Sequence, residues 1–140
     1  MRAAWMRWPL IAAALVTLTA TGCSTGGSSA SCAAQEITVG DSPLRPGGEV
    51  RLSVDWMTAT CEDTGGMNRT ARNIAVTITS SKTGVEYLLG TVDAASGPHF
   101  TVSGRFDLPT DLPSGDATLS VTSSMGDRAS FSRHVRVTDR

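Results

Sequence analysis

The 140-residue sequence predicts an all-β protein, a sandwich of seven short strands. From residue 35 onward, apolar and polar residues alternate with a period of two, and clusters of Gly, Pro, Asp and Ser separate these runs. No segment after residue 22 has apolar residues at the three- and four-residue spacing of an amphipathic helix. Seven such runs in the last 105 or so residues fit two packed antiparallel sheets.

The first two expected strands cover residues 35–39 and 49–56, with turns at 40–43 and 46–48 between them. The second has the clearest alternation. Its inward face is Val50, Leu52, Val54 and Trp56, and its outward face is Arg51, Ser53 and Asp55.

The middle of the chain repeats this pattern. Ile74, Val76 and Ile78 mark the inward face of the third strand, and residues 81–84 form a turn into a fourth strand over 85–92. The inward residues of the fifth strand are Phe100, Val102, Phe106 and Leu108. Gly104 lies within that strand and predicts a bulge there.

The last two strands complete the predicted sandwich. Ala117, Leu119 and Val121 mark the sixth strand, and Phe131, Val135 and Val137 the seventh. Arg133 has the inward parity of the seventh strand, which predicts either a bulge or an edge position. The immunoglobulin-like version of the sandwich is expected. Two of its hallmarks are missing. Cys32 precedes the first strand and Cys61 follows the second, so the usual disulfide between strands is absent. Trp56 ends the second strand, whereas the tryptophan of such domains lies on the third.

The N-terminus has the parts of an export signal. Arg2 and Arg7 precede the uncharged stretch 8–20, whose roughly thirteen residues are too few for a bilayer, which needs about 20. The run Leu18-Thr19-Ala20-Thr21-Gly22-Cys23 resembles the lipobox of bacterial lipoproteins. The resemblance implies cleavage before Cys23, a diacylglycerol on its thiol, and a protein tethered to the extracytoplasmic face of the cell membrane. The alternative is an ordinary secretory signal that is cut elsewhere.

This interpretation divides the chain into a signal peptide (1–22), a tether (23–34) and one domain (35–140). The tether is rich in Ser and Gly, so we expect a flexible coil. Removing residues 1–22 takes away two of the 12 basic residues and none of the 13 acidic ones, which leaves a formal charge of −3. That charge argues against nucleic acid or anionic lipid as a partner.

Lipidation of Cys23 leaves Cys32 and Cys61, which we expect to form a disulfide because the exported compartment is oxidising. Closing a loop of this size stabilises a fold by roughly 3–4 kcal/mol in the chain-entropy model. The alternative is a metal site, but neither His99 nor His134 is near either cysteine in the sequence.

Three turn motifs resemble those of small bacterial lipoproteins of the actinobacterial type with a single Ig-like domain. They are the proline-rich corner from Leu108 to Leu119, Pro46-Gly47-Gly48 before the second strand, and Cys61-Glu62-Asp63-Thr64-Gly65 after it. The corner match is partial, because Ala117 occupies the position of the expected tyrosine. The resemblance covers most of residues 32–138 and implies the fold, but it brings no catalytic residues with it.

Catalysis is not expected, because no nucleophile, base and orienting group form a recognisable set. No cofactor is predicted. An exported copper or zinc carrier is the alternative function, since small β-sandwiches of that kind use Met and His. The candidate ligands here are scattered: Met57, Met67, Met125, His99 and His134.

The predicted function is therefore a binding or structural module in the cell envelope. Its candidate binding loop covers residues 57–73, a long connection for a compact domain, and includes Glu62, Asp63, Met67, Arg69 and Arg72. Such a loop can also be an idle connection held by its disulfide. Besides the membrane, which Cys23 would anchor, the partner could be an envelope protein, a wall polymer or a small molecule.

Overall fold

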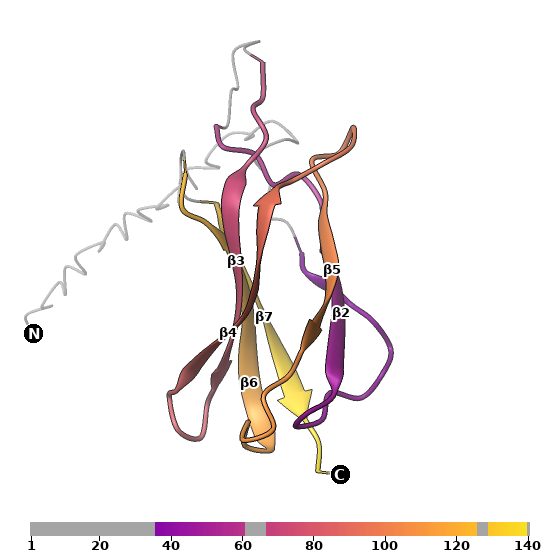
Figure 1. Ribbon diagram of the computed structural model, residues 1–140, viewed down its shortest axis with the longest axis vertical. Helices are drawn as coiled ribbons and strands as arrows, with labels where there is room; N and C mark the ends of the chain where they lie inside the picture. Colours follow the sequence, from indigo (N-terminus) through magenta and orange to yellow (C-terminus); the bar gives the residue numbers. More distant parts are fainter. Residues whose placement is uncertain (1–35, 61–66, 126–128, 140) are drawn as a thin grey trace, which may run out of the picture.

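The computed structural model describes residues 36–60, 67–125 and 129–139. These residues form a β-sandwich, as predicted (Figure 1). Its strands are β1 (Thr38–Val39), β2 (Glu49–Val54), β3 (Arg72–Ser80), β4 (Glu86–Ala94), β5 (Val102–Asp107), β6 (Gly115–Ser123) and β7 (Ser130–Val137).

Two antiparallel sheets face each other. One has the strand order β1-β2-β5 and the other β4-β3-β6-β7. The architecture is that of an Ig-like sandwich, with one difference from the constant-type domain. There the fourth strand pairs with the fifth, whereas here β4 pairs with β3.

The predicted inward faces are confirmed for the second strand as far as Val54 and for the third and sixth strands. Side chains from both sheets interdigitate in the core, where they are almost completely buried: Val50, Leu52, Val54, Ile74, Val76, Ile78, Ala117, Leu119 and Val121. Alternation of apolar and polar residues is sufficient to predict these faces, because a period of two sends every second side chain to the same side of a sheet.

The ends of two predicted strands are wrong. β2 ends at Val54, and Trp56 has a φ of 61°, so the chain leaves the extended conformation and the ring is only half-buried. Phe100 has a φ of 48° and lies outside β5, which begins at Val102. A left-handed residue interrupts the extended backbone, so the period of two cannot continue through it.

The bulge predicted at Gly104 is also wrong. Gly104 pairs directly with Leu52, and the register of β2 and β5 is continuous. A register shift lies instead between β3 and β4, where Val76 pairs with Gly90 and Thr77 with Leu88.

Gly104 serves the packing of an aromatic ring. A Cβ on Gly104 would lie 3.0 Å from the ring of Phe106, and a Cβ on Gly90 would lie 2.9 Å from it. Gly90 belongs to β4 in one sheet, and Gly104 to β5 in the other. The two glycines thus leave room for the Phe106 ring between the edge strands of the two sheets.

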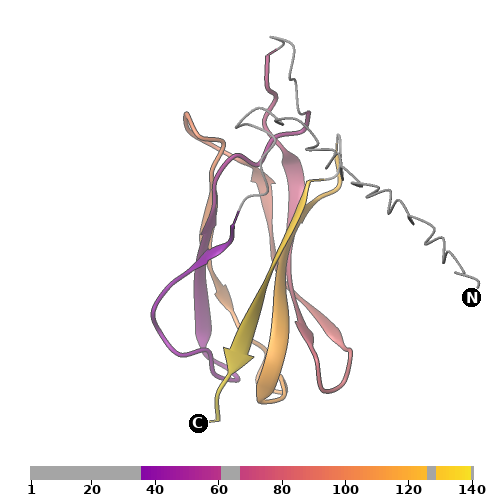
Figure 2. The same cartoon turned by 180° about the vertical axis from the view of Figure 1, so that it is seen from behind.

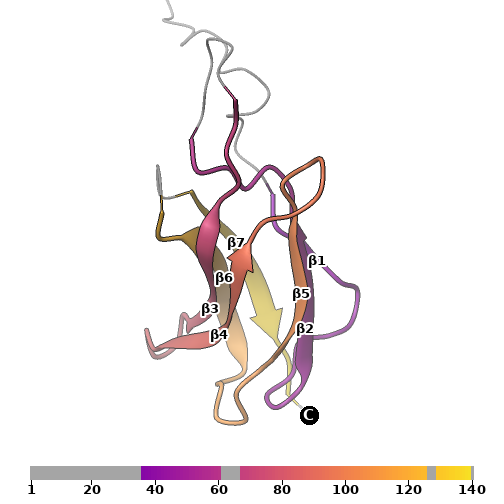
Figure 3. The same cartoon turned by 45° about the horizontal axis from the view of Figure 1, so that its top comes forward.

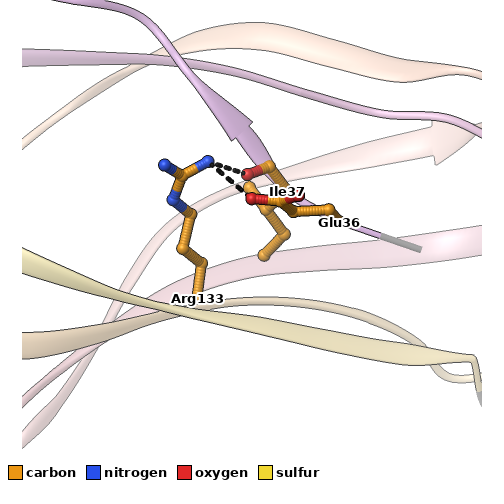
Figure 4. Close-up of polar contacts among 3 residues, drawn as sticks. All are labelled: Glu36, Ile37 and Arg133. Carbon is orange, nitrogen blue, oxygen red and sulfur yellow. Dashed lines mark hydrogen bonds and ion pairs between the residues drawn. The ribbon is translucent and has the colours of Figure 1, made fainter. Parts of the chain in front are cut away.

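The opposite side of the sandwich is closed by polar contacts from β7. The register of β6 and β7 is continuous and β7 is an edge strand, which confirms the second of the two alternatives for Arg133. Arg133 Nη1 donates to the carbonyl of Ile37 at 2.6 Å and lies 3.4 Å from Glu36 Oε1 (Figure 4). The amide of Thr138 donates to the carbonyl of Leu44 at 2.8 Å. These contacts join the chain around β1 to the other sheet.

Candidate functional site

Three connections between strands meet at one end of the sandwich (Figures 1 and 3). They are the β2–β3, β4–β5 and β6–β7 connections. Their described residues, 55–60, 67–71, 95–101 and 124–125, are called here the loop end. The chain enters β1 near this end, since Thr38 pairs with Ser53, while β7 ends at the other end (Figure 2).

Backbone hydrogen bonds join the β2–β3 and β4–β5 connections to each other and hold the β6–β7 connection against the start of β3. The amides of Trp56 and Met57 donate to the carbonyls of His99 and Phe100, at 2.7 and 3.0 Å. The amide of Ala95 donates to the carbonyl of Ala71 at 3.0 Å. On the other side, the amide of Ser124 donates to the carbonyl of Asn73 at 3.3 Å. The loops are therefore held relative to one another at their bases.

The base of the predicted binding loop is more ordered than a simple connection. Thr58 and Thr70 form an antiparallel bridge, and the amide of Ala59 donates to the carbonyl of Arg69 at 2.7 Å. Met57 and Ala71 are completely buried. These two apolar side chains continue the core past the ends of β2 and β3, which explains why the two arms of the loop stay together.

Three of the candidate binding residues lie at the surface. Met67 is 90% exposed, and Arg69 and Arg72 are exposed as well. Arg69 and Arg72 line one groove of about 500 Å³ together with Ala59, Thr60, Thr70 and Met125. Glu62, Asp63 and the three cysteines Cys23, Cys32 and Cys61 lie outside the described residues.

Buried hydroxyl groups fix the backbone beneath this groove. Ser123 is fully buried, and its Oγ lies 2.9 Å from the carbonyl of Arg72 and 3.1 Å from that of Met125. Thr70 Oγ1 donates to the carbonyl of Ala95 at 2.6 Å. The two arginines therefore extend from backbone that is held in place, and their guanidinium groups can bind acidic or planar ligands.

An aromatic cluster at the loop end was not predicted from the sequence. The rings of Trp56 and His99 are 5.1 Å apart with an interplanar angle of 34°, and Phe100 lies 6.4 Å from Trp56. Thr101 Oγ1 donates to Asp55 Oδ1 at 2.6 Å across the same two connections. The Gly97-Pro98 turn before His99 is the only signal that the sequence offers for this arrangement.

Two aromatic residues of this cluster have left-handed backbone, Trp56 and Phe100. A non-glycine residue in this region costs roughly 1–3 kcal/mol. Strain of this kind is concentrated at binding and catalytic sites. Here it turns the ring of Trp56 away from the core and toward His99.

The side chains proposed for the alternative metal carrier are divided between the core, the loop end and the outer face of β7. No group of three His, Cys, Asp or Glu residues able to hold a metal is found in the described parts of the chain. Met57 lies in the core, His99 at the loop end, and His134 on the outer face of β7, 3.4 Å from Thr118 Oγ1. No helix long and apolar enough to cross a membrane is found among the described residues.

Comparisons with known proteins give no family for this chain. No protein family matches its sequence, and no curated protein matches it either. Among solved structures, it is similar to the sporulation control protein Spo0M from Bacillus subtilis, with 16% sequence identity and a TM-score of 0.43. The similarity covers 76% of this chain and 49% of that one.

Proposed function

We propose that this protein is a binding or structural module, held on the extracytoplasmic face of the cell membrane by a lipid on Cys23, and that the loop end is its recognition surface. The observation that supports this most is that hydrogen bonds join two of the loops directly and hold the third against the adjoining start of β3. Rigid scaffolds that present loops at one end are a common arrangement for recognition.

The composition of the loop end supports the same proposal. Trp56 and Arg69 of the loop end, and Arg72 beside it at the start of β3, belong to the residue types that dominate interface energies. Met67 and Met125 are exposed, and methionine adapts its shape to different partners. An envelope protein or a wall polymer would offer the extended surface that these side chains can cover together.

The test is site-specific photo-crosslinking in intact cells. A photoreactive residue replaces Arg69 at the loop end, and in a matched control it replaces Lys82, which is exposed in the turn between β3 and β4 at the opposite end. We expect crosslinked species from position 69 and none from position 82. Adducts from position 82 alone, or the same adducts from both positions, would contradict the proposal.

A double variant then measures how much the two arginines contribute. Arg69→Ala with Arg72→Ala should weaken binding to the crosslinked partner at least tenfold. Because both side chains are exposed, the free energy of unfolding should change by no more than about 0.5 kcal/mol for each substitution. An unchanged affinity would show that the groove does not recognise the partner.

A further inference from the structure

The outer face of the β1-β2-β5 sheet is arranged in chemically distinct rows. Because β2 and β5 are in register, Ser53 is opposite Ser103, Arg51 is opposite Arg105, and Glu49 is opposite Asp107. Thr38 on β1 pairs with Ser53 and extends the first row. Gly40 extends the second row, since its amide donates to the carbonyl of Arg51 at 2.9 Å. A row with two guanidinium groups thus lies between a row of hydroxyls and a row of acids.

The central row is unfavourable for the isolated fold. Like charges directly opposite each other on a sheet are destabilising. Glu49 reduces the repulsion between Arg51 and Arg105 only in part. Its Oε1 lies 3.8 Å from Arg105 Nε, and both side chains of this pair are largely exposed. None of the ion pairs among the described residues involves Arg51. The fold therefore keeps two opposed arginines where a neutral pair would be more stable.

The same two arginines border an open groove of about 460 Å³, a volume within the range of small-molecule sites. Its lining includes Thr38, Gly40, Ser53 and Ser103 beside the two arginines. Gly40 contributes no side chain to its row, which leaves space next to Arg51. All of these residues belong to the three strands of this sheet and their immediate extensions, so the backbone at the base of the groove is held in place by the sheet.

We propose that this groove binds the phosphate group of a larger ligand between Arg51 and Arg105. A guanidinium group donates in a planar fork, and a hydroxyl can turn its proton toward an acceptor. The groove combines two guanidinium groups from adjacent strands with hydroxyls from Thr38, Ser53 and Ser103. The acidic row at Glu49 and Asp107 repels an anion on one side, so the phosphate lies over the guanidinium and hydroxyl rows.

The arrangement favours phosphate over carboxylate. The two oxygens of a carboxylate lie in one plane and can be satisfied by a single bidentate arginine. A phosphate has oxygens in several directions, and these can accept from two guanidinium groups and a neighbouring hydroxyl at once. This site is independent of the loop end, because it lies on the outer face of a sheet and shares no residue with the groove at Arg69 and Arg72.

The experiment follows backbone amide resonances of the full-length chain in non-ionic detergent during titration with inorganic phosphate at constant ionic strength. We expect saturable shifts at Thr38, Gly40 and Ser103. Arg51→Gln and Arg105→Gln should each raise the Kd at least tenfold. The matched control is Arg136→Gln, an exposed arginine on the outer face of the other sheet that also has an acidic partner, Asp116 at 3.6 Å. It should leave the Kd within twofold.

Further titrations separate the sources of the phosphate. Glycerol 3-phosphate represents a soluble monoester, and glycerophosphoglycerol represents the diester of a lipid headgroup. Tighter binding of one of them than of inorganic phosphate identifies the class of ligand. Three results would each overturn the proposal: no saturable shift with any phosphate, an equal loss of affinity in Arg136→Gln, or acetate that binds as tightly as phosphate.

Discussion

At the scale of single residues, Arg133 shows how a charged side chain can occupy an inward position of a strand. The other residues on the same face of the strand are apolar: Phe131, Val135 and Val137. Because β7 is an edge strand, the guanidinium group can reach past the sheet to the carbonyl of Ile37 and to Glu36 (Figure 4). The side chain is 40% exposed, so the charge remains partly in water.

Arg133→Ala should therefore destabilise the fold by about 1–3 kcal/mol. The substitution removes the donor to the carbonyl of Ile37 and leaves that oxygen without its partner. Arg136→Ala is the control, since Arg136 is 77% exposed and forms only a surface ion pair, which contributes about 0–1 kcal/mol. Urea denaturation of both variants measures the difference. Equal destabilisation would mean that the contact with Ile37 contributes nothing.

At the scale of the strands, the two sides of the sandwich are closed by different means. Polar contacts from β7 hold the chain around β1 on one side. On the other side, the Phe106 ring fills the space between β4 and β5, where Gly90 and Gly104 allow it to fit.

Gly90→Ala should destabilise the protein by about 1–3 kcal/mol, because the new methyl group would overlap the Phe106 ring, and overpacked cores lose stability on this order. Gly40→Ala is the matched control. Its Cβ would lie 3.5 Å from the nearest atom, an ordinary contact. Thermal unfolding gives both values. If the clash is the cause, adding Phe106→Leu should recover part of the loss in Gly90→Ala, whereas strictly additive effects would argue against it.

Much of the arrangement of the strands can be predicted from the sequence. The inward faces of β2, β3 and β6 depend only on alternation, which is local. The position of Gly104 shows the limit of such reasoning. A glycine in a strand indicates either a bulge or a close approach. The choice here depends on a ring two residues along the same strand and on Gly90 in the other sheet.

The candidate site was predicted to a similar extent. The exposure of Met67 and Arg69 agrees with their place in a polar connection, whereas Arg72 is exposed at the first position of β3, so the predicted loop extends two residues too far. The contact between Trp56 and His99 could not be predicted, because it joins two connections and depends on a left-handed residue at position 56. The opposition of Arg51 and Arg105 likewise requires the register of β2 with β5, which no local pattern gives.

At the scale of the whole molecule, the path of the chain bears on how the domain lies on a membrane. Glu36 follows Cys23 by 13 positions, and the flexible coil predicted from the sequence would span about 20 Å on average over that length. A strand of nine residues is about 30 Å long, so such a tether would be shorter than the domain. A lipid on Cys23 would then hold the loop end near the membrane, and we expect its partner there.

Cys23→Ser should release the protein from membranes. The diacylglycerol supplies the two acyl chains that stable anchoring requires, and serine cannot carry them through a thioether. Detergent phase partitioning of cell extracts measures the effect. The wild-type chain is expected in the detergent phase and the variant in the aqueous phase or as the uncleaved precursor. Wild-type protein in the aqueous phase would show that the lipobox interpretation is wrong.

The cysteines Cys32 and Cys61 should be joined in the exported protein. Mass spectrometry of a non-reduced digest is expected to find their two peptides linked, and reduction should separate them. The bridge would tie the end of the tether to the β2–β3 connection and limit how far the loop end can move from its anchor. Free thiols, or a metal bound to both, would favour the carrier function instead.

The position of Trp56 also allows its intrinsic fluorescence to be used as a probe of the loop end. The other two tryptophans, Trp5 and Trp8, lie within the segment that export is expected to remove. The mature chain would then contain a single indole, and it lies against His99 at the loop end. Its emission spectrum would thus come from this surface alone. A change in intensity or wavelength when an envelope fraction is added would reveal contact at the loop end, without any label and before the partner has been identified.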